Sequence, residues 1–254
     1  MFQKLDNSKH IYFASDLHLG TPNYEESLLR EKEFVLWLSR IQANCKTLFL
    51  VGDIFDFWFD YKTAIPKGYV RVLGKLAEFV DQGIVVHYFK GNHDMWLNGY
   101  FEQELGLIVH EENYTFEENG VKFFVGHGDG KGPKDFRYKL LKKIFRNPIC
   151  QWLFKWIHPD IGMGIAQFWS KRSRYGSGEV KEKFLGEDKE WLVQYIKKKH
   201  PAQQANYYIF GHRHLAIEHK IDDKTSYINL GDWINFKSYA CFDGVETKLH
   251  YFKV

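Results

Sequence analysis

The sequence predicts a layered α/β protein, because apolar runs typical of buried strands alternate with segments of helical periodicity. The apolar runs are residues 11–15, 47–51 and 84–90, and each stops at a short motif rich in acidic residues or glycine. Between them, residues 25–42 and 69–82 carry apolar side chains at helical spacing. Strand, loop and helix thus repeat in the order expected of an α/β layer.

The second half of the chain predicts a second sheet. Short strands are expected at residues 121–125, 207–210, 226–230 and 248–252, and little helical signal follows residue 200. Strands that follow one another without helices between them favour a partly antiparallel sheet.

Composition indicates a globular protein with reduced cysteines. The chain has 254 residues, of which 44% are hydrophobic, enough for one large domain or two small ones. Cys45, Cys150 and Cys241 are odd in number and far apart, so no disulfide framework is expected. A basic region followed by an apolar run is missing at the start, and no run reaches the ~18 to 20 apolar residues of a membrane span. We therefore expect a cytoplasmic protein.

Residues 131–190 interrupt the α/β pattern, and we expect them to form a helical cap on a core made of residues 1–130 and 191–254. Residues 135–146 place apolar side chains on one helical face, and residues 149–157 are rich in aromatic side chains. Positions 131 to 183 contain 13 Lys or Arg against four Asp or Glu. Such a basic region favours an anionic partner, namely phosphates, nucleic acid or an acidic membrane surface, although a solvated helix face is the simpler alternative.

Five short motifs contain the side chains best suited to bind metal ions. They are residues 16–18, 52–56, 91–94, 126–129 and 211–214. Their candidate ligands are Asp16, His18, Asp53, Asn92, His127, His212 and His214. Each motif follows an expected strand, and the carboxyl ends of strands are where open α/β sheets bind ligands. Carboxylate, imidazole and amide donors without cysteine suit two catalytic divalent ions, Mn²⁺ first, with Fe²⁺ or Zn²⁺ as alternatives.

The spacing of these ligands suggests how two ions are shared. Two ions ~3.5 to 4 Å apart need a bridging carboxylate, for which Asp53 is the candidate. Asp16 and His18 are expected to point the same way, because strand side chains repeat every two residues. Asp56 and Asp129 are expected to have supporting roles, capping a helix or orienting a ligand imidazole.

The ordered motifs, from residue 16 to residue 214, resemble those of the calcineurin-like metallophosphoesterase superfamily. The resemblance implies a four-layer αββα sandwich and a hydroxide that bridges the metals as nucleophile. It implies that one ion is held by Asp16, His18, Asp53 and His214, and the other by Asp53, Asn92, His127 and His212. It also implies that His93 acts as an acid or transition-state stabiliser with Asp94 as its partner, a role that suits imidazole near pH 7.

Three segments extend the resemblance to the UDP-2,3-diacylglucosamine pyrophosphohydrolases of lipid A synthesis: residues 126–129, 158–162 and 170–174. This resemblance implies hydrolysis to UMP and 2,3-diacylglucosamine 1-phosphate through attack on the α-phosphorus. Asn92 would then bind the substrate, and Lys171, Arg172 and Arg174 would bind its diphosphate or an acidic membrane surface. An apolar slot for the acyl chains is expected from Trp152, Leu153, Phe154, Trp156, Phe168 and Trp169.

Two positions depart from the lipid A pattern, and two rival functions remain open. His93 stands where many members have Arg, and Gly231-Asp232-Trp233 differs from many members and has no assigned role. A nuclease or other phosphodiesterase would also need metals and a basic aromatic surface, and a membrane-bound binding module is the third class. Because the aromatic residues lie in amphipathic helices, an internal slot is favoured over a nucleic-acid platform. We expect peripheral association with the cytoplasmic face of the inner membrane.

Overall fold

The computed structural model describes residues 9–132, 142–175, 183–184 and 186–254. The first of its two sheets has the strand order β11-β10-β1-β2-β3-β4. β1 to β4 are mutually parallel, and β10 joins β1 antiparallel. The bounds of these strands are β1 His10–Ala14, β2 Cys45–Leu50, β3 Val85–Phe89, β4 Ile108–His110, β10 Ser238–Phe242 and β11 Thr247–Tyr251.

The second sheet has the order β5-β6-β7-β9-β8 and is mixed, as expected from the sequence. β6, β7 and β9 are parallel, whereas β5 and β8 pair antiparallel at the two edges. The bounds are β5 Tyr114–Glu118, β6 Val121–Gly126, β7 Tyr207–Phe210, β8 Ala216–Lys220 and β9 Ser226–Leu230.

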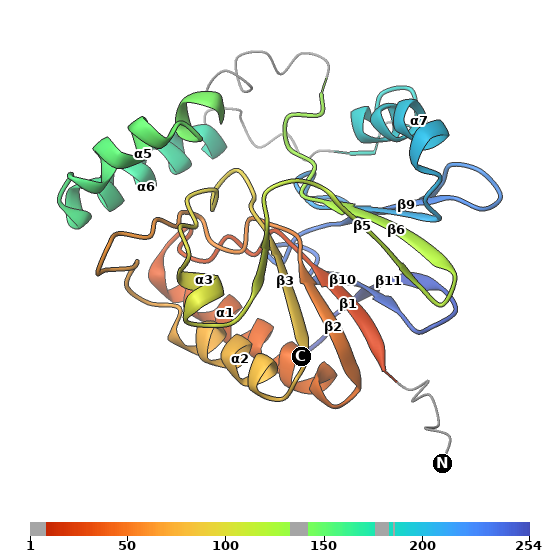
Figure 1. The fold of residues 1–254 in the computed structure, drawn as a ribbon, viewed down its shortest axis with the longest axis horizontal. Helices are drawn as coiled ribbons and strands as arrows, with labels where there is room; N and C mark the ends of the chain where they lie inside the picture. Colours follow the sequence, from red (N-terminus) through yellow and green to blue (C-terminus); the bar gives the residue numbers. More distant parts are fainter. Residues whose placement is uncertain (1–8, 133–141, 176–182, 185) are drawn as a thin grey trace.

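Helices cover the outer face of each sheet, which gives the expected four-layer αββα sandwich (Figure 1). α1 (Tyr24–Ile41), α2 (Val70–Asp81) and the short α3 (Tyr100–Gln103) cover the first sheet, and α7 (Trp191–Gln203) covers the second. A one-turn helix, Gln42–Asn44, leads from α1 to β2. The sheets face each other across a core that includes Phe13, Phe49, Phe123, Ile209 and Ile228.

Two further helices, α5 (Pro148–Lys155) and α6 (Pro159–Tyr175), lie side by side outside the sandwich (Figure 1). Phe154 of α5 packs on Phe59 and Trp96 of the core, with ring centroids 4.7 Å apart in both pairs. Of the expected helix at 135–146, residues 142–145 are helical, whereas 135–141 lie outside the described residues. None of the helices in the described part of the chain is long and apolar enough to cross a membrane.

Apart from the helix expected at 135–146, most of which lies outside the described residues, the predicted elements match the structure to within two residues, but several elements were missed. The missed strands are β4, β5, β8 and β10, and the missed helices are α3 and α7. β4 has three residues, and β5 and β8 are edge strands with alternating exposed side chains. α7 buries Leu192, Val193 and Ile196 amid lysines, too narrow an apolar face to stand out in the sequence.

A carboxylate from α1 caps the start of α2, and its removal is expected to destabilise the protein. Glu31 is buried, and its Oε1 accepts hydrogen bonds from the N–H groups of Arg71 and Val72 at 2.9 and 3.1 Å. Glu31→Ala removes the acceptor from two N–H groups at the start of the helix, so we expect unfolding free energy to fall by about 1–3 kcal/mol. Urea denaturation measures the loss. Lys32→Ala, at the exposed neighbouring position, is the control, and equal midpoints for the two variants would contradict the capping role.

Candidate dinuclear metal centre

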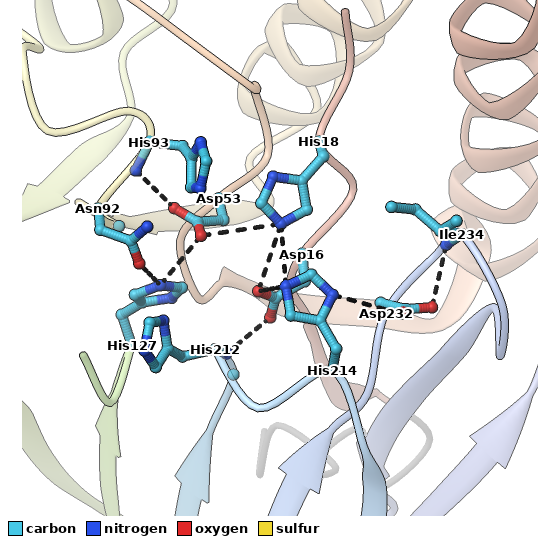
Figure 2. Close-up of polar contacts among 12 residues, drawn as sticks. Asp16, His18, Asp53, Asn92, His93, His127, His212, His214, Asp232 and Ile234 are labelled. Atoms are coloured by element: carbon cyan, nitrogen blue, oxygen red, sulfur yellow. Dashed lines mark hydrogen bonds and ion pairs between the residues drawn. The ribbon is translucent and has the colours of Figure 1, made fainter. Parts of the chain in front are cut away.

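The five motifs predicted from the sequence meet at the carboxyl ends of strands from both sheets (Figure 2). The motif residues that follow β1, β2, β3, β6 and β7 are, in that order, Asp16, Asp53, Asn92, His127 and His212. Backbone hydrogen bonds join the loops: the N–H of His18 donates to the carbonyl of Asp53 at 2.9 Å, and that of Gly211 to the carbonyl of His127 at 3.0 Å. These bonds fix the loops within each sheet, and the N–H of His212, which donates to Oδ2 of Asp16 at 2.9 Å, fixes the ligands of one sheet relative to those of the other.

Five of the candidate ligands have left-handed backbone conformations. The φ angles are 55° at Asp16, 46° at His18, 54° at Asp53, 67° at His212 and 49° at His214. The expected reason for Asp16 and His18 to point the same way is therefore wrong, because β1 ends at Ala14 and both lie in the loop beyond it. Non-glycine residues in this region cost roughly 1 kcal/mol or more each, so tight turns in the surrounding loops must hold them there.

Glycine next to a ligand allows two of these loops to approach closely. A Cβ atom at Gly91 would lie 2.1 Å from Oδ1 of Asp53, and one at Gly211 would lie 2.5 Å from Oδ2 of Asp16. Both distances are far below a van der Waals contact. The glycines that begin these two motifs, Gly91 and Gly211, are thus explained by packing of one loop against the carboxylate of another.

The first group of ligand atoms belongs to Asp16, His18 and His214. Oδ1 of Asp16 lies 3.8 Å from Nε2 of His18 and 3.5 Å from Nε2 of His214. The two imidazole rings stack, with their Nε2 atoms 3.2 Å apart. All three side chains therefore present ligand atoms to one common point, as expected from the sequence.

The second group belongs to Asp53, His127 and His212, with Asn92 beside it. Nε2 of His127 lies 3.3 Å from Oδ2 of Asp53 and 3.2 Å from Oδ1 of Asn92. Oδ2 of Asp53 is also 3.8 Å from Nε2 of His18, a member of the first group. Asp53 consequently lies between the groups, where the bridging carboxylate was predicted (Figure 2).

The residues present fit two divalent cations. Oδ1 of Asp16 is buried and has no hydrogen-bond partner among the described residues, although it faces two imidazole nitrogens. A buried carboxylate oxygen without a hydrogen-bond partner is destabilising unless a cation neutralises it. Carboxylate and imidazole atoms within 4.8 Å of one another in each group, with the amide of Asn92 beside the second group, satisfy that requirement.

Three ligand imidazoles are oriented through their second ring nitrogen. Nδ1 of His127 donates to the carbonyl of Val51 at 2.8 Å, and Nδ1 of His214 lies 3.3 Å from Oδ2 of Asp232. Nδ1 of His18 lies 3.6 Å from Oδ1 of Asp56, so Asp56 is placed to orient this imidazole, one of the supporting roles expected for it. Asp232 was missed as a supporting residue. Its signal was the unassigned Gly231-Asp232-Trp233 motif.

Burial and mutual charge shift the protonation of the site in the absence of cations. Burial raises the pKa of Asp16. Burial alone would also raise the pKa of Asp53, but the imidazoles of His127 and His93 hold this pKa well below its usual value. Burial alone would lower the pKa of His127, but the carboxylate of Asp53 raises it to about 10. A bound cation takes the place of such protons, so metal binding releases them.

Asp94 holds the loops together and does not pair with His93 as expected. Its carboxylate accepts hydrogen bonds from the N–H groups of Gly91 and Ile54 at 2.8 and 2.9 Å, and from the hydroxyl of Tyr88. The predicted partnership is wrong because Asp56 occupies that place. Asp94 is fully buried, and burial together with the charge of Asp53 raises its pKa to about 6.

His93 lies at the edge of the ligand cluster. Its backbone N–H donates to Oδ1 of Asp53 at 2.9 Å, and its ring meets that of His18 edge to face. Nδ1 lies 3.0 Å from the backbone carbonyl of Asp56, and because a carbonyl only accepts, this nitrogen carries a proton. Nε2 is then the ring nitrogen left to meet a substrate.

A cavity of about 390 Å³ adjoins His93 beneath the cap. Its apolar lining includes Phe57, Met95, Trp96, Phe145, Phe154, Ile157 and Ile165, while Asn92, His93 and Asp56 lie on its polar side. Of the aromatic slot expected from the sequence, only Phe154 belongs to this lining among the described side chains. The other described members are exposed at the surface: Trp152, Leu153, Trp156 and Phe168.

The cap also reaches the metal loops through charge. Lys142 pairs with Asp129, the last residue of the motif that contains His127. Burial would raise the pKa of Asp129, but His127 and Lys142 lower it to about 2. Lys171, Arg172 and Arg174 lie on α6, but their side chains are outside the described part of the structure. Their role in substrate binding stays a prediction.

Comparisons with known proteins identify the family to which the chain belongs. The chain is 39% identical to the UDP-2,3-diacylglucosamine hydrolase of Porphyromonas gingivalis, over 94% of this chain and 96% of that protein. It is 25% identical to the protein of the same name from Yersinia pestis, over 83% of this chain and 84% of that one. A solved phosphoesterase from E. coli aligns with a TM-score of 0.43 at 15% identity, covering 91% of this chain and 87% of that chain. Residues 9–216 match the family model of the calcineurin-like phosphoesterases, and the chain therefore belongs to that family.

Proposed function

We propose that this metal-dependent hydrolase cleaves UDP-2,3-diacylglucosamine to UMP and 2,3-diacylglucosamine 1-phosphate. The observation that carries the proposal is the apolar cavity that adjoins Asn92 and His93, beside the metal ligands. One ligand with phosphates at one end and acyl chains at the other would fit that arrangement. The names of the two curated relatives support the same substrate.

The chemistry divides between the cations and the chain. When bound, two divalent cations supply an activated water and neutralise charge on the phosphoryl oxygens. Asn92 and His93 line the cavity where it meets the ligand cluster, which suits them to hold the diphosphate there. Attack at the α-phosphorus expels the sugar phosphate, a stable anion that needs little protonation. Nε2 of His93 then serves chiefly to stabilise charge on the phosphoryl group.

For the metal, the proposal is Mn²⁺, with Fe²⁺ or Zn²⁺ as alternatives that the same donors accept. The two groups combine carboxylate and amide oxygens with imidazole nitrogens. Oxygen donors suit Mn²⁺, whereas imidazole nitrogens suit Zn²⁺ and Fe²⁺. Metal analysis of the purified protein separates these ions.

For the location, the proposal is peripheral attachment to the cytoplasmic face of the inner membrane through the cap. Six large apolar side chains on or directly next to α5 and α6 are exposed: Ile149, Trp152, Leu153, Trp156, Ile161 and Phe168. Lys143, Arg146 and Lys155 lie in the same region. Tryptophan is enriched at membrane interfaces, and basic residues attract anionic headgroups. Because these aromatic side chains are exposed, their amphipathic spacing no longer argues against a nucleic-acid binding surface. The choice between a lipid nucleotide and a nucleic acid as substrate therefore depends on the apolar cavity and on the names of the relatives.

Replacement of the bridging carboxylate tests the metal centre. Because Asp53 lies between both ligand groups, Asp53→Ala should lower bound metal from two ions per chain to one or none. We expect turnover of the lipid nucleotide to fall by at least roughly 100-fold. Metal analysis and product release measure the two effects, with the exposed Asp81→Ala as control. Two bound ions and unchanged turnover in Asp53→Ala would refute the bridge.

Isotope labelling tests which phosphorus is attacked. In ¹⁸O-labelled water, attack at the α-phosphorus places the label in UMP, and mass spectrometry of both products detects it. Label in the lipid phosphate would show attack at the β-phosphorus and a reversed orientation of the substrate under the cap.

Changes on the outer surface of the cap test the membrane proposal. Trp152 and Trp156 are 56% and 77% exposed, and their rings contact each other. The double change Trp152→Ser and Trp156→Ser should weaken binding to anionic lipid vesicles by about tenfold or more, because buried aromatic area is lost at the interface. Co-sedimentation measures binding. Val245→Ser, on an exposed turn far along the chain, is the control, and a loss no greater than in this control would exclude attachment through these side chains.

A further inference from the structure

A serine of the cap contacts the residues that surround His93. Ser170 of α6 is buried, with 8% of its surface exposed, and its Oγ donates to Oδ2 of Asp56 at 2.8 Å. The same Oγ lies 3.4 Å from Nδ1 of His93. The other carboxylate oxygen, Oδ1 of Asp56, is 3.6 Å from Nδ1 of both His18 and His93. Ser170 thus meets a carboxylate that faces two imidazoles of the site.

The direction of these hydrogen bonds follows from the acceptors. Nδ1 of His93 donates its proton to the carbonyl of Asp56 at 3.0 Å, so Oγ of Ser170, 3.4 Å away, can meet this nitrogen only as a second acceptor of the same proton. The serine therefore accepts from His93 and donates its own proton to the carboxylate. In this arrangement the imidazole has one preferred tautomer and one ring orientation, with Nε2 left for the substrate.

Ser170 also belongs to the wall of the apolar cavity. Ala166, one helical turn earlier on α6, lines the same cavity, because residues four apart share a helix face. The position of α6 over the cavity consequently sets the position of the serine hydroxyl.

We propose that Ser170 is a positioning residue, which acts through Asp56 to hold the His93 ring in its productive orientation. The inference rests on the proposed phosphoester hydrolysis but not on the identity of the lipid nucleotide. A loss of alignment lowers kcat, whereas KM changes little because the serine is not required to bind the substrate.

An isosteric pair of variants separates the hydroxyl from the packing. Ser170→Thr keeps the hydroxyl, and Ser170→Val has nearly the same shape without it. With the metal-loaded enzyme and a chromogenic phosphodiester, we expect near wild-type kcat for the Thr variant. The Val variant should lose roughly tenfold or more in kcat at unchanged KM. In the metal-free protein, the ¹⁵N resonance of His93 Nδ1 should shift in the Val variant only.

Three results would overturn the proposal. Equal losses in both variants would mean that the position matters for packing, and an effect confined to KM would make Ser170 a substrate contact. Loss of a metal ion in the Val variant alone would place the effect at His18 rather than His93. Because the small phosphodiester is used, failure to cleave the lipid nucleotide would refute the proposed substrate without affecting this test.

Discussion

The structure depends on the concentration of acidic and imidazole groups in one buried crevice between the ends of two sheets. Asp16, Asp53 and Asp94 are almost completely buried and lie close to one another in space. Carboxylates so placed repel each other and lose hydration, which is tolerable only with hydrogen bonds and counter-charges. Asp94 is satisfied by backbone N–H groups, whereas Oδ1 of Asp16 faces two imidazole nitrogens at a place where a bound cation would neutralise it.

This constraint explains the unusual backbone of the site. Ligands taken from five separate loops converge only if the loops turn sharply directly after the strands, and left-handed residues at Asp16, Asp53 and His212 make those turns. The strain is held by bonds between loops, such as that from the N–H of His212 to Oδ2 of Asp16 at 2.9 Å. The sandwich therefore holds the strained ligand residues in place, because it fixes the strand ends from which their loops begin.

The layered fold and the clustering of the candidate metal ligands were predictable from the sequence because both depend on local pattern. Apolar runs marked the central strands, and polar motifs marked their ends. Contacts between distant segments were not predictable: Asp56, not Asp94, faces His93, and Asp232 supports His214 across a long stretch of chain. The cap shows the same limit, since amphipathic spacing revealed an apolar face on α5 but not that Trp152 points outward while Phe154 points inward.

The cap has apolar side chains on two surfaces, and this arrangement links the site to its surroundings. Phe154 and Ile165 face the cavity, while Trp156 and Phe168 are exposed on the outside. A helix that is apolar on both sides is normally buried in a core or in lipid. Because the cavity beneath α5 and α6 ends at Asn92 and His93, an acyl chain entering it would bring an attached phosphate to the metal ligands. If these outer side chains bind a membrane, as proposed, the cavity beneath the cap would lie next to the lipid phase from which the proposed substrate is drawn.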